Sequence, residues 1–364
     1  MSTKNAPIAA ATTIATTTAS LRLIAALALI LGLSPAQPVA AAASATRGSD
    51  YAPADRSIDR STEDRILALA PDNISPSDVR DVLARATAPR IIALQGSLPL
   101  VTMRPFAQFL IAMGYPEARL SDPRDGSLSR ASNGSSAQLA GEVAWYYEAE
   151  GLMPMLIGHS QGGMLAIKVL HELAGSFASE VEVWNPVSNT SEHRNWIRDP
   201  RSGAIRPVVG LKLPYVAALA TGKLPRWVLG QWSMLDKVRQ IPDSVEEFSG
   251  YTIEWDPIAG TFPGSEPYRA LGSARVRNVT LTVATSHIAM PDARALALDP
   301  VTRAWIDVYR PGENLPLPSS AQAEASNLLH AADIWFSVKK YWCIELQRSI
   351  RARRGISAAQ GARA

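Results

Sequence analysis

The sequence predicts an α/β fold in which a mostly parallel, doubly wound sheet is covered by helices on both faces. Short apolar runs that are typical of buried strands alternate with segments whose apolar residues recur at helical spacing. One of the apolar runs leads into a glycine-rich turn that is followed at once by a helical pattern. Strands alternating with helices across short turns favour parallel pairing of the strands.

The predicted elements follow one another from about residue 62. Helical patterns cover Thr62–Ala70, residues 75–83, Phe106–Met113, Gln138–Glu150 and Met164–Leu173. Buried strands are predicted at Arg90–Leu94, Met155–Ile157, Glu180–Trp184, Tyr251–Trp255 and Val279–Val283. Residues 120–136 are rich in Asp, Ser, Gly and Arg, so we expect them to form a loop.

Residues 186–250 interrupt this alternation and are too long for a simple loop. They hold short apolar segments, among them Val208–Leu219, which prolines divide. We therefore expect an inserted helical cap or lid over the functional site, with ordinary packing against the core as the alternative. The two halves of the core would then be residues 62–185 and 251–318.

The N-terminal residues 1–45 predict a secretory signal peptide. They contain no acidic residue, their only charges are Lys4 and Arg22, and an apolar run over Leu23–Leu33 precedes Ala-x-Ala sites. The run is short for a membrane span, and an uncleaved anchor is the alternative. We expect an exported protein, periplasmic or secreted, with residues 46–61 as a flexible lead-in.

Charge and cysteine content limit the partners and the sources of stability. Loss of the signal peptide removes two positive charges and no negative ones from a chain of net charge +3, so the mature chain is close to neutral. Its alkaline pI is therefore no evidence for a nucleic-acid partner, and we predict none. Cys343 is the single cysteine, which excludes an internal disulfide. The sequence contains no metal or cofactor motif, so we predict neither.

The stretch Gly158-His159-Ser160-Gln161-Gly162 is the most informative about function. Gly-x-Ser-x-Gly between a strand and a helix is the pattern of a nucleophile elbow, in which the serine lies at the tip of a tight, strained turn. Side chains two residues to either side must be nearly absent, and glycine meets that need. We predict Ser160 as a nucleophile; the alternative is a glycine-rich turn that only joins two elements.

A serine hydroxyl needs a base within hydrogen-bond reach. His287 follows the predicted strand Val279–Val283, and catalytic groups in such sheets gather at the carboxyl ends of strands. We therefore predict His287 as the base. The other four histidines lie on the wrong side of the elbow, within predicted helices or in the predicted cap: His159, His171, His330 and His193.

The group that orients the base should lie between Ser160 and His287, since the usual chain order is serine, acid, histidine. Asp256 ends the predicted strand Tyr251–Trp255 and is the predicted acid. The alternatives lie deeper in the strand, in the predicted cap or after the histidine: Glu254, Asp236, Asp243 and Asp292.

An oxyanion hole needs backbone N–H groups where negative charge develops. One should come from Gln161, which directly follows the nucleophile. The other should come from the turn Gln95–Leu98 after the first strand, where we predict Ser97, with Leu98 as the alternative.

Residues from about Arg90 to about Asp292 resemble the α/β-hydrolase superfamily, and the elbow is similar to that of secreted bacterial lipases. Two features depart from that family: Gln95-Gly96 stands where His-Gly is usual, and the cysteine pair and calcium site of some secreted lipases find no support. The resemblance implies acyl transfer to water, with attack by Ser160, proton transfer to His287 and an oxyanion held by Gln161 and Ser97.

The predicted activity is therefore that of an exported carboxylester hydrolase, of lipase or esterase type, without a cofactor. An apolar cap favours a hydrophobic ester or lipid as substrate. The alternatives with the same triad are an acyltransferase, an amidase, a thioesterase or a polyester depolymerase. An alternative of another class is a non-catalytic lipid-binding protein of the cell envelope.

The C-terminal residues 319–364 predict an amphipathic helix, from about Ser320 to Arg354, with a basic tail. One interpretation is peripheral contact with an anionic membrane surface. The other is a helix packed on the sheet with solvated basic residues at its end, and we favour it because cations near a helix C-terminus are stabilising.

Overall fold

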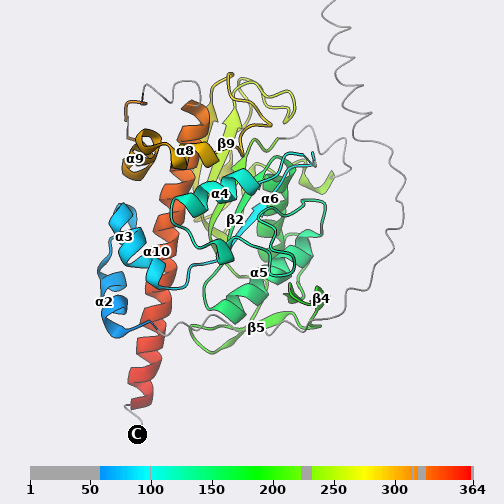
Figure 1. Cartoon of the computed structure of the whole chain (residues 1–364). Coiled ribbons are helices and arrows are strands. Elements are labelled where there is room, and N and C mark those ends of the chain that lie inside the picture. The colour runs from blue at the N-terminus through cyan, green and yellow to red at the C-terminus, as the bar shows by residue number, and fades with distance from the viewer. Residues whose placement is uncertain (1–57, 99, 223–231, 314, 319–324, 362–364) are drawn as a thin grey trace, which may run out of the picture. The chain divides into compact units, whose positions relative to one another are not determined.

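The computed structural model describes residues 58–98, 100–222, 232–313, 315–318 and 325–361 (Figure 1). All of them belong to the unit Asp50–Ala364. The predicted signal peptide and most of the predicted lead-in lie outside the described residues, as does part of the predicted cap.

A five-stranded sheet forms the centre of the fold, in the order β1-β2-β7-β9-β11. Every neighbouring pair of strands is parallel. The strands are β1 (Ile91–Leu94), β2 (Met155–His159), β7 (Leu213–Leu219), β9 (Val245–Ile253) and β11 (Arg275–Leu281). The predicted α/β class with a parallel sheet is confirmed, and the order of the strands in the sheet is their order along the chain.

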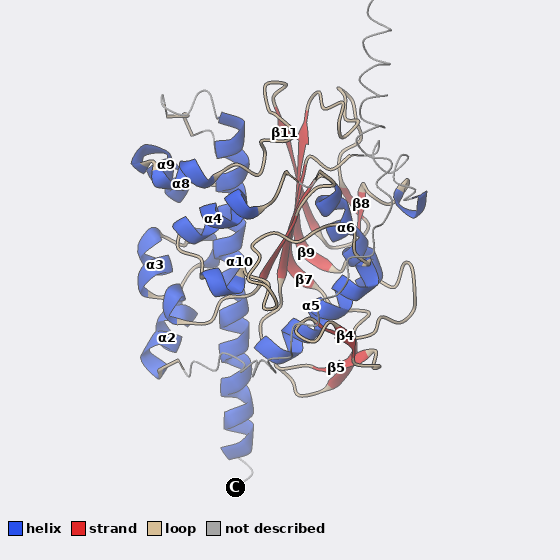
Figure 2. Ribbon diagram, turned by 45° about the vertical axis from the view of Figure 1, so that its right-hand side comes forward, coloured by secondary structure: helices blue, strands red, loops and turns tan. Residues whose placement is uncertain are grey.

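Alternate residues of each strand enter two different apolar clusters, because successive side chains of a strand point to opposite faces. Ile91 and Ala93 of β1 belong to one cluster, whereas Ile92 and Leu94 belong to the other. Helices cover both faces, as Figure 2 shows. The second cluster contains side chains of α5 (Ser136–Glu150) and α6 (Gln161–Leu173).

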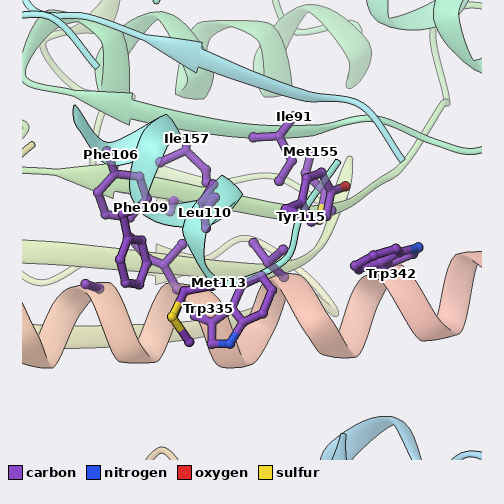
Figure 3. Packing of buried hydrophobic residues seen from close by; sticks show 14 of the residues in the cluster. Ile91, Phe106, Phe109, Leu110, Met113, Tyr115, Met155, Ile157, Trp335 and Trp342 are labelled. Atoms are coloured by element: carbon purple, nitrogen blue, oxygen red, sulfur yellow. The ribbon is translucent and has the colours of Figure 1, made fainter. Parts of the chain in front are cut away.

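The first cluster lies under the larger set of helices. Figure 3 shows Leu110 of α4 near Ile157 of β2, and Trp335 of α10 near Met113 at the end of α4. The helices that contribute to it are α2 (Arg60–Ala68), α3 (Pro76–Asp81), α4 (Arg104–Ala112), α8 (Arg294–Leu298), α9 (Pro300–Val308) and α10 (Ala325–Gly361). Short 3-10 turns occur at Pro71–Asn73, Leu83–Arg85, Glu117–Arg119 and Trp232–Met234.

The long helix α10 packs its apolar side chains inside the protein. Trp335 and Trp342 are buried, and the Trp342 ring meets Tyr115 edge-on at 5.0 Å between centroids. The basic residues of α10 contact carboxylate or carbonyl oxygens of the protein: Lys339, Lys340, Arg348, Arg351, Arg353 and Arg354. The helix therefore packs on the sheet, as the second of the two interpretations expects. The apolar side chains of α10, which a membrane surface would need to contact, lie largely in the core.

No helix in the described part of the chain combines the length and the apolar character that crossing a membrane requires.

The prediction of a helical cap over residues 186–250 is wrong for part of this range. Leu213–Leu219 is not helical but forms β7, the middle strand of the sheet, and β9 begins at Val245. The described residues 186–222 and 232–250 contain no α-helix. Two small hairpins precede β7: β3 (Trp184–Asn185) with β4 (Thr190–Ser191), and β5 (Trp196–Arg198) with β6 (Ile205–Pro207). A further pair joins β8 (Gln240–Ile241) to β10 (Arg269–Ala270).

The strand predicted at Glu180–Trp184 does not join the central sheet. Val183 exchanges backbone hydrogen bonds with the following hairpin: it donates to Arg194 at 2.7 Å and accepts from Glu192 at 2.9 Å. This segment packs directly on α5, where a Cβ added at Gly141 would lie 2.1 Å from the carbonyl oxygen of Glu182. The position in the sheet beside β2 is taken by β7 instead.

Candidate active site

Ser160 occupies a strained turn between β2 and α6. Its φ of 53° and ψ of −116° lie in a backbone region that residues other than glycine rarely adopt. Such a conformation costs about 1–3 kcal/mol and persists only where neighbouring structure enforces it. Here the Ser160 N–H donates to Leu219 of β7 at 2.7 Å, and the Thr221 hydroxyl donates to the Ser160 carbonyl at 2.9 Å.

The glycines around Ser160 are needed because backbone packs where side chains would be. A Cβ at Gly158 would lie 2.3 Å from the carbonyl oxygen of Gly162, and one at Gly162 would lie 2.1 Å from that of Leu94. A Cβ at Gly163 would lie 2.0 Å from the Thr221 hydroxyl. The predicted steric requirement for glycine on both sides of the serine therefore holds in the structure.

His287 and Asp256 form a directly bonded pair. His287 Nδ1 lies 2.6 Å from Asp256 Oδ2, and both residues are buried. The other carboxylate oxygen, Oδ1, accepts the N–H groups of Ile258 and Ala259, each at 3.0 Å. Since a carboxylate only accepts, Nδ1 carries the proton, and Nε2 of the neutral ring is left with the lone pair that a base needs.

One pocket brings the predicted nucleophile and base together. Ser160 comes from the end of β2 and His287 from the segment after β11, and both line it. Asp256 lies behind His287, in the segment after β9. The remaining lining residues are Gly96, Ser97, Leu98, Val101, His159 and Ile258.

The two backbone N–H groups predicted for an oxyanion hole belong to Gln161, which directly follows Ser160, and to Ser97, which lines the pocket. Within the described residues, neither the Gln161 nor the Ser97 N–H donates to a protein acceptor. Gln161 is the first residue of α6, where N–H groups have no partner within the helix. The turn that carries Ser97 is fixed at Gln95, whose N–H donates to Arg130 at 2.9 Å and whose side-chain carbonyl accepts from Ser129 at 2.8 Å.

His159 is a site residue that the sequence analysis placed on the wrong side of the elbow. Its Nε2 lies 2.8 Å from the carbonyl oxygen of His287, and the two imidazole rings are 5.0 Å apart. Burial, and after it the electrostatic effect of the neighbouring His287, lower the pKa of His159 to about 3. A signal was available: Met155, Ile157 and His159 alternate along β2, so His159 points to the face on which α10 packs.

The other residues considered lie elsewhere. His330, on α10, is bonded through Nε2 to the Met290 carbonyl at 2.9 Å, and His171 through Nε2 to the Gln240 carbonyl at 3.0 Å. Among the described carboxylates, Asp256 is the one bonded to His287. The alternatives that do not contact His287 are Glu254, Asp236, Asp243 and Asp292.

The described residues contain no group of three or more His, Cys, Asp or Glu side chains placed to hold a metal ion. The sequence matches no model of a known protein family, and no curated protein matches it.

Proposed function

We propose that the protein is a serine hydrolase of the α/β-hydrolase type that cleaves carboxylic esters. Ser160 is the nucleophile, His287 the general base and Asp256 the residue that orients the base. The observation that carries this proposal is the 2.6 Å bond from His287 to Asp256, in a pocket that His287 shares with a serine held at a φ of 53°. Three segments that lie far apart in the sequence meet to make this arrangement.

The geometry supports an acyl-enzyme mechanism. Ser160 Oγ attacks the ester carbonyl while His287 Nε2 takes the hydroxyl proton, and Asp256 stabilises the imidazolium that results. The N–H groups of Gln161 and Ser97 bind the oxyanion. His287 then returns the proton to the leaving alcohol, and the C–O bond to that alcohol breaks. Water repeats the sequence on the acyl-enzyme, which releases the acid and Ser160.

The substrate that fits best is an ester with a hydrophobic acyl group. Leu98, Val101 and Ile258 give the pocket apolar walls next to Ser160. Export of the enzyme, which the composition of residues 1–45 predicts, is part of this proposal and would place the substrate outside the cytoplasm.

A serine-directed probe tests the proposal. Wild type and Ser160→Ala are purified after expression of the full-length gene. Both are exposed to a fluorophosphonate and to p-nitrophenyl esters from acetate to palmitate. The wild type is expected to take up label and to turn over ester, and Ser160→Ala to do neither, because the mutation removes the attacking oxygen.

A matched control is Ser188→Ala, which removes the hydroxyl of an exposed serine that does not line the pocket. This variant should label as fast as wild type to within a few-fold. Equal labelling of wild type and Ser160→Ala would exclude Ser160 as the nucleophile. A wild type that neither labels nor turns over any ester of the panel would contradict the proposed activity.

A further inference from the structure

The chain around His287 has little regular structure to hold it. His287 follows β11 in a segment that is neither helix nor strand, and its neighbours Ser286 and Ile288 are exposed, as are residues 282–284. A base must stay within hydrogen-bond reach of the nucleophile to take its proton. The bond to Asp256 orients the ring but does not hold the main chain. Hydrogen bonds hold the chain on either side, from the Ala289 N–H to Ser286 at 3.2 Å and from Asn327 to the Ala289 carbonyl at 3.1 Å, but they do not involve the backbone of His287. Another contact must fix the main chain of His287 itself.

His159 makes the contact that does so. Its Nε2 lies 2.8 Å from the His287 carbonyl oxygen, and since a carbonyl only accepts, Nε2 carries the proton. His159 is 1% exposed and ends β2, directly before Ser160. One side chain thus ties the residue next to the nucleophile to the main chain of the base.

The opposite ring nitrogen of His159 has no second hydrogen bond within the described part of the chain that would compete for the orientation of the ring. Nδ1 is buried and has no hydrogen-bond partner among the described residues, although an unpaired buried acceptor is costly. It lies against the turn Gln95–Leu98, where a Cβ added at Gly96 would be 3.3 Å from it. The ring therefore gives up one hydrogen bond and keeps the one to His287.

We propose that His159 is a positioning residue, whose N–H bond to the His287 carbonyl holds the catalytic base in reach of Ser160. This inference rests on the proposed function, because the bond from His159 would keep Ser160 and His287 in place relative to each other. The titratable groups around His159 are His287, Asp256 and His330. A neutral His159 can donate to His287 without setting a second cation beside the imidazolium that forms during catalysis.

The test compares His159→Phe with His159→Gln. Phenylalanine keeps a planar ring but cannot donate, whereas the glutamine amide places an N–H near the position of Nε2. For His159→Phe we expect kcat to fall about 10- to 100-fold, the size of effect that a misplacement of about 1 Å can produce. KM should change less than kcat, because the phenylalanine ring keeps an aromatic side chain at the pocket wall that His159 forms, and the rate of fluorophosphonate labelling should fall with kcat. His159→Gln should recover kcat to within a few-fold of wild type.

Thermal unfolding of each variant separates positioning from folding. A His159→Phe variant that keeps wild-type kcat would overturn the inference, as would a His159→Gln variant that loses as much kcat as His159→Phe at an unchanged Tm. If His159→Phe does not fold, His159→Asn replaces it, since the asparagine amide is too short to reach the carbonyl. Failure of the proposed function looks different, because the wild type itself would then neither label nor turn over ester.

Discussion

The turn that carries Ser160 and the segments that carry Asp256 and His287 are held in place in different ways. Around Ser160, backbone atoms fill the space beside Gly158 and Gly162, so the serine has no other position to take. Around His287, position depends on directional hydrogen bonds from side chains, made with Asp256 and with His159. The nucleophile should therefore be sensitive to added volume, and the base to the loss of a single polar atom.

The largest effect should come from the hydrogen bonds of the base. Asp256→Asn keeps the shape of the side chain, but its amide donates towards His287 Nδ1 and leaves the ring with its proton on Nε2. That tautomer cannot take the Ser160 proton, so kcat should fall by about 10⁴-fold at neutral pH while the protein stays folded. The measurement is ester turnover together with thermal unfolding.

Asp243→Asn is the matched control for this change. Asp243 is a carboxylate that accepts N–H groups of a turn, at Ala274 for example, and it does not contact His287. Its variant should keep wild-type turnover. A loss of less than tenfold in Asp256→Asn would contradict the assignment of the acid.

The second effect tests whether close backbone packing around Gly158 fixes the turn that carries Ser160. A Cβ in Gly158→Ala would lie 2.3 Å from one backbone oxygen and 2.4 Å from a backbone nitrogen, and neither atom can move without breaking the turn. We expect a loss of about 3 kcal/mol or more in the free energy of unfolding, or no soluble protein. Gly134→Ala, at a position with open space, should unfold like wild type in the same urea titration. A Gly158→Ala protein of unchanged stability would show that the backbone of the turn can shift to make room for a side chain.

The smallest effect is the pH dependence that His159, the side chain that joins the two regions, gives to the free energy of unfolding. The pKa of His159 is lowered from its usual 6.5 to about 3, so below about pH 6.5 the unfolded chain binds a proton that the folded protein does not. The stability contributed by the neutral ring is therefore complete above that pH and is lost as pH falls towards 3.

Replacing the group that titrates should remove this dependence. Between about pH 7 and about pH 4.5, wild type should lose about 2–3 kcal/mol more unfolding free energy than His159→Gln, measured by urea denaturation. The remaining titratable groups are common to both proteins and cancel in the comparison. Parallel pH dependences would show that His159 is protonated in the folded state.

Much of the fold could be predicted because its elements carry local signals. Helix α3 begins with Ser75, which caps it with Asp78 in a reciprocal pair of hydrogen bonds, and proline follows at the first position. Strand β7 carried no such signal. It is buried on both faces, so its residues are apolar throughout and look like a buried helix, and Pro214 lies within it. Proline normally argues against a central strand, and here it is only the second residue of the strand.

The predicted residues of the site were brought together for a physical reason. Parallel strands end at the same edge of a sheet, so the segments after β2, β9 and β11 lie near one another even though about a hundred residues separate Ser160 from Asp256. His159 could not be assigned from chain order, because its partner is a backbone carbonyl 128 positions away. Such a contact leaves no motif in the sequence, and the alternation along β2 indicates only the face to which His159 points.

The order of the strands has a consequence for how the protein can assemble. Because β1, β2, β7, β9 and β11 occur in the sheet as they occur in the chain, each strand pairs with its predecessor, and none must be inserted between two strands already joined. As the chain is synthesised from its N-terminus, each new strand can therefore add to the same edge of the sheet. The last helices reach back to the start of the fold: Arg303 of α9 bonds to the Ala112 carbonyl, and Lys339 and Gln347 of α10 bond to carbonyl oxygens of Ile74 and Ile66. Completion of the core therefore waits for the last segment of the chain to emerge.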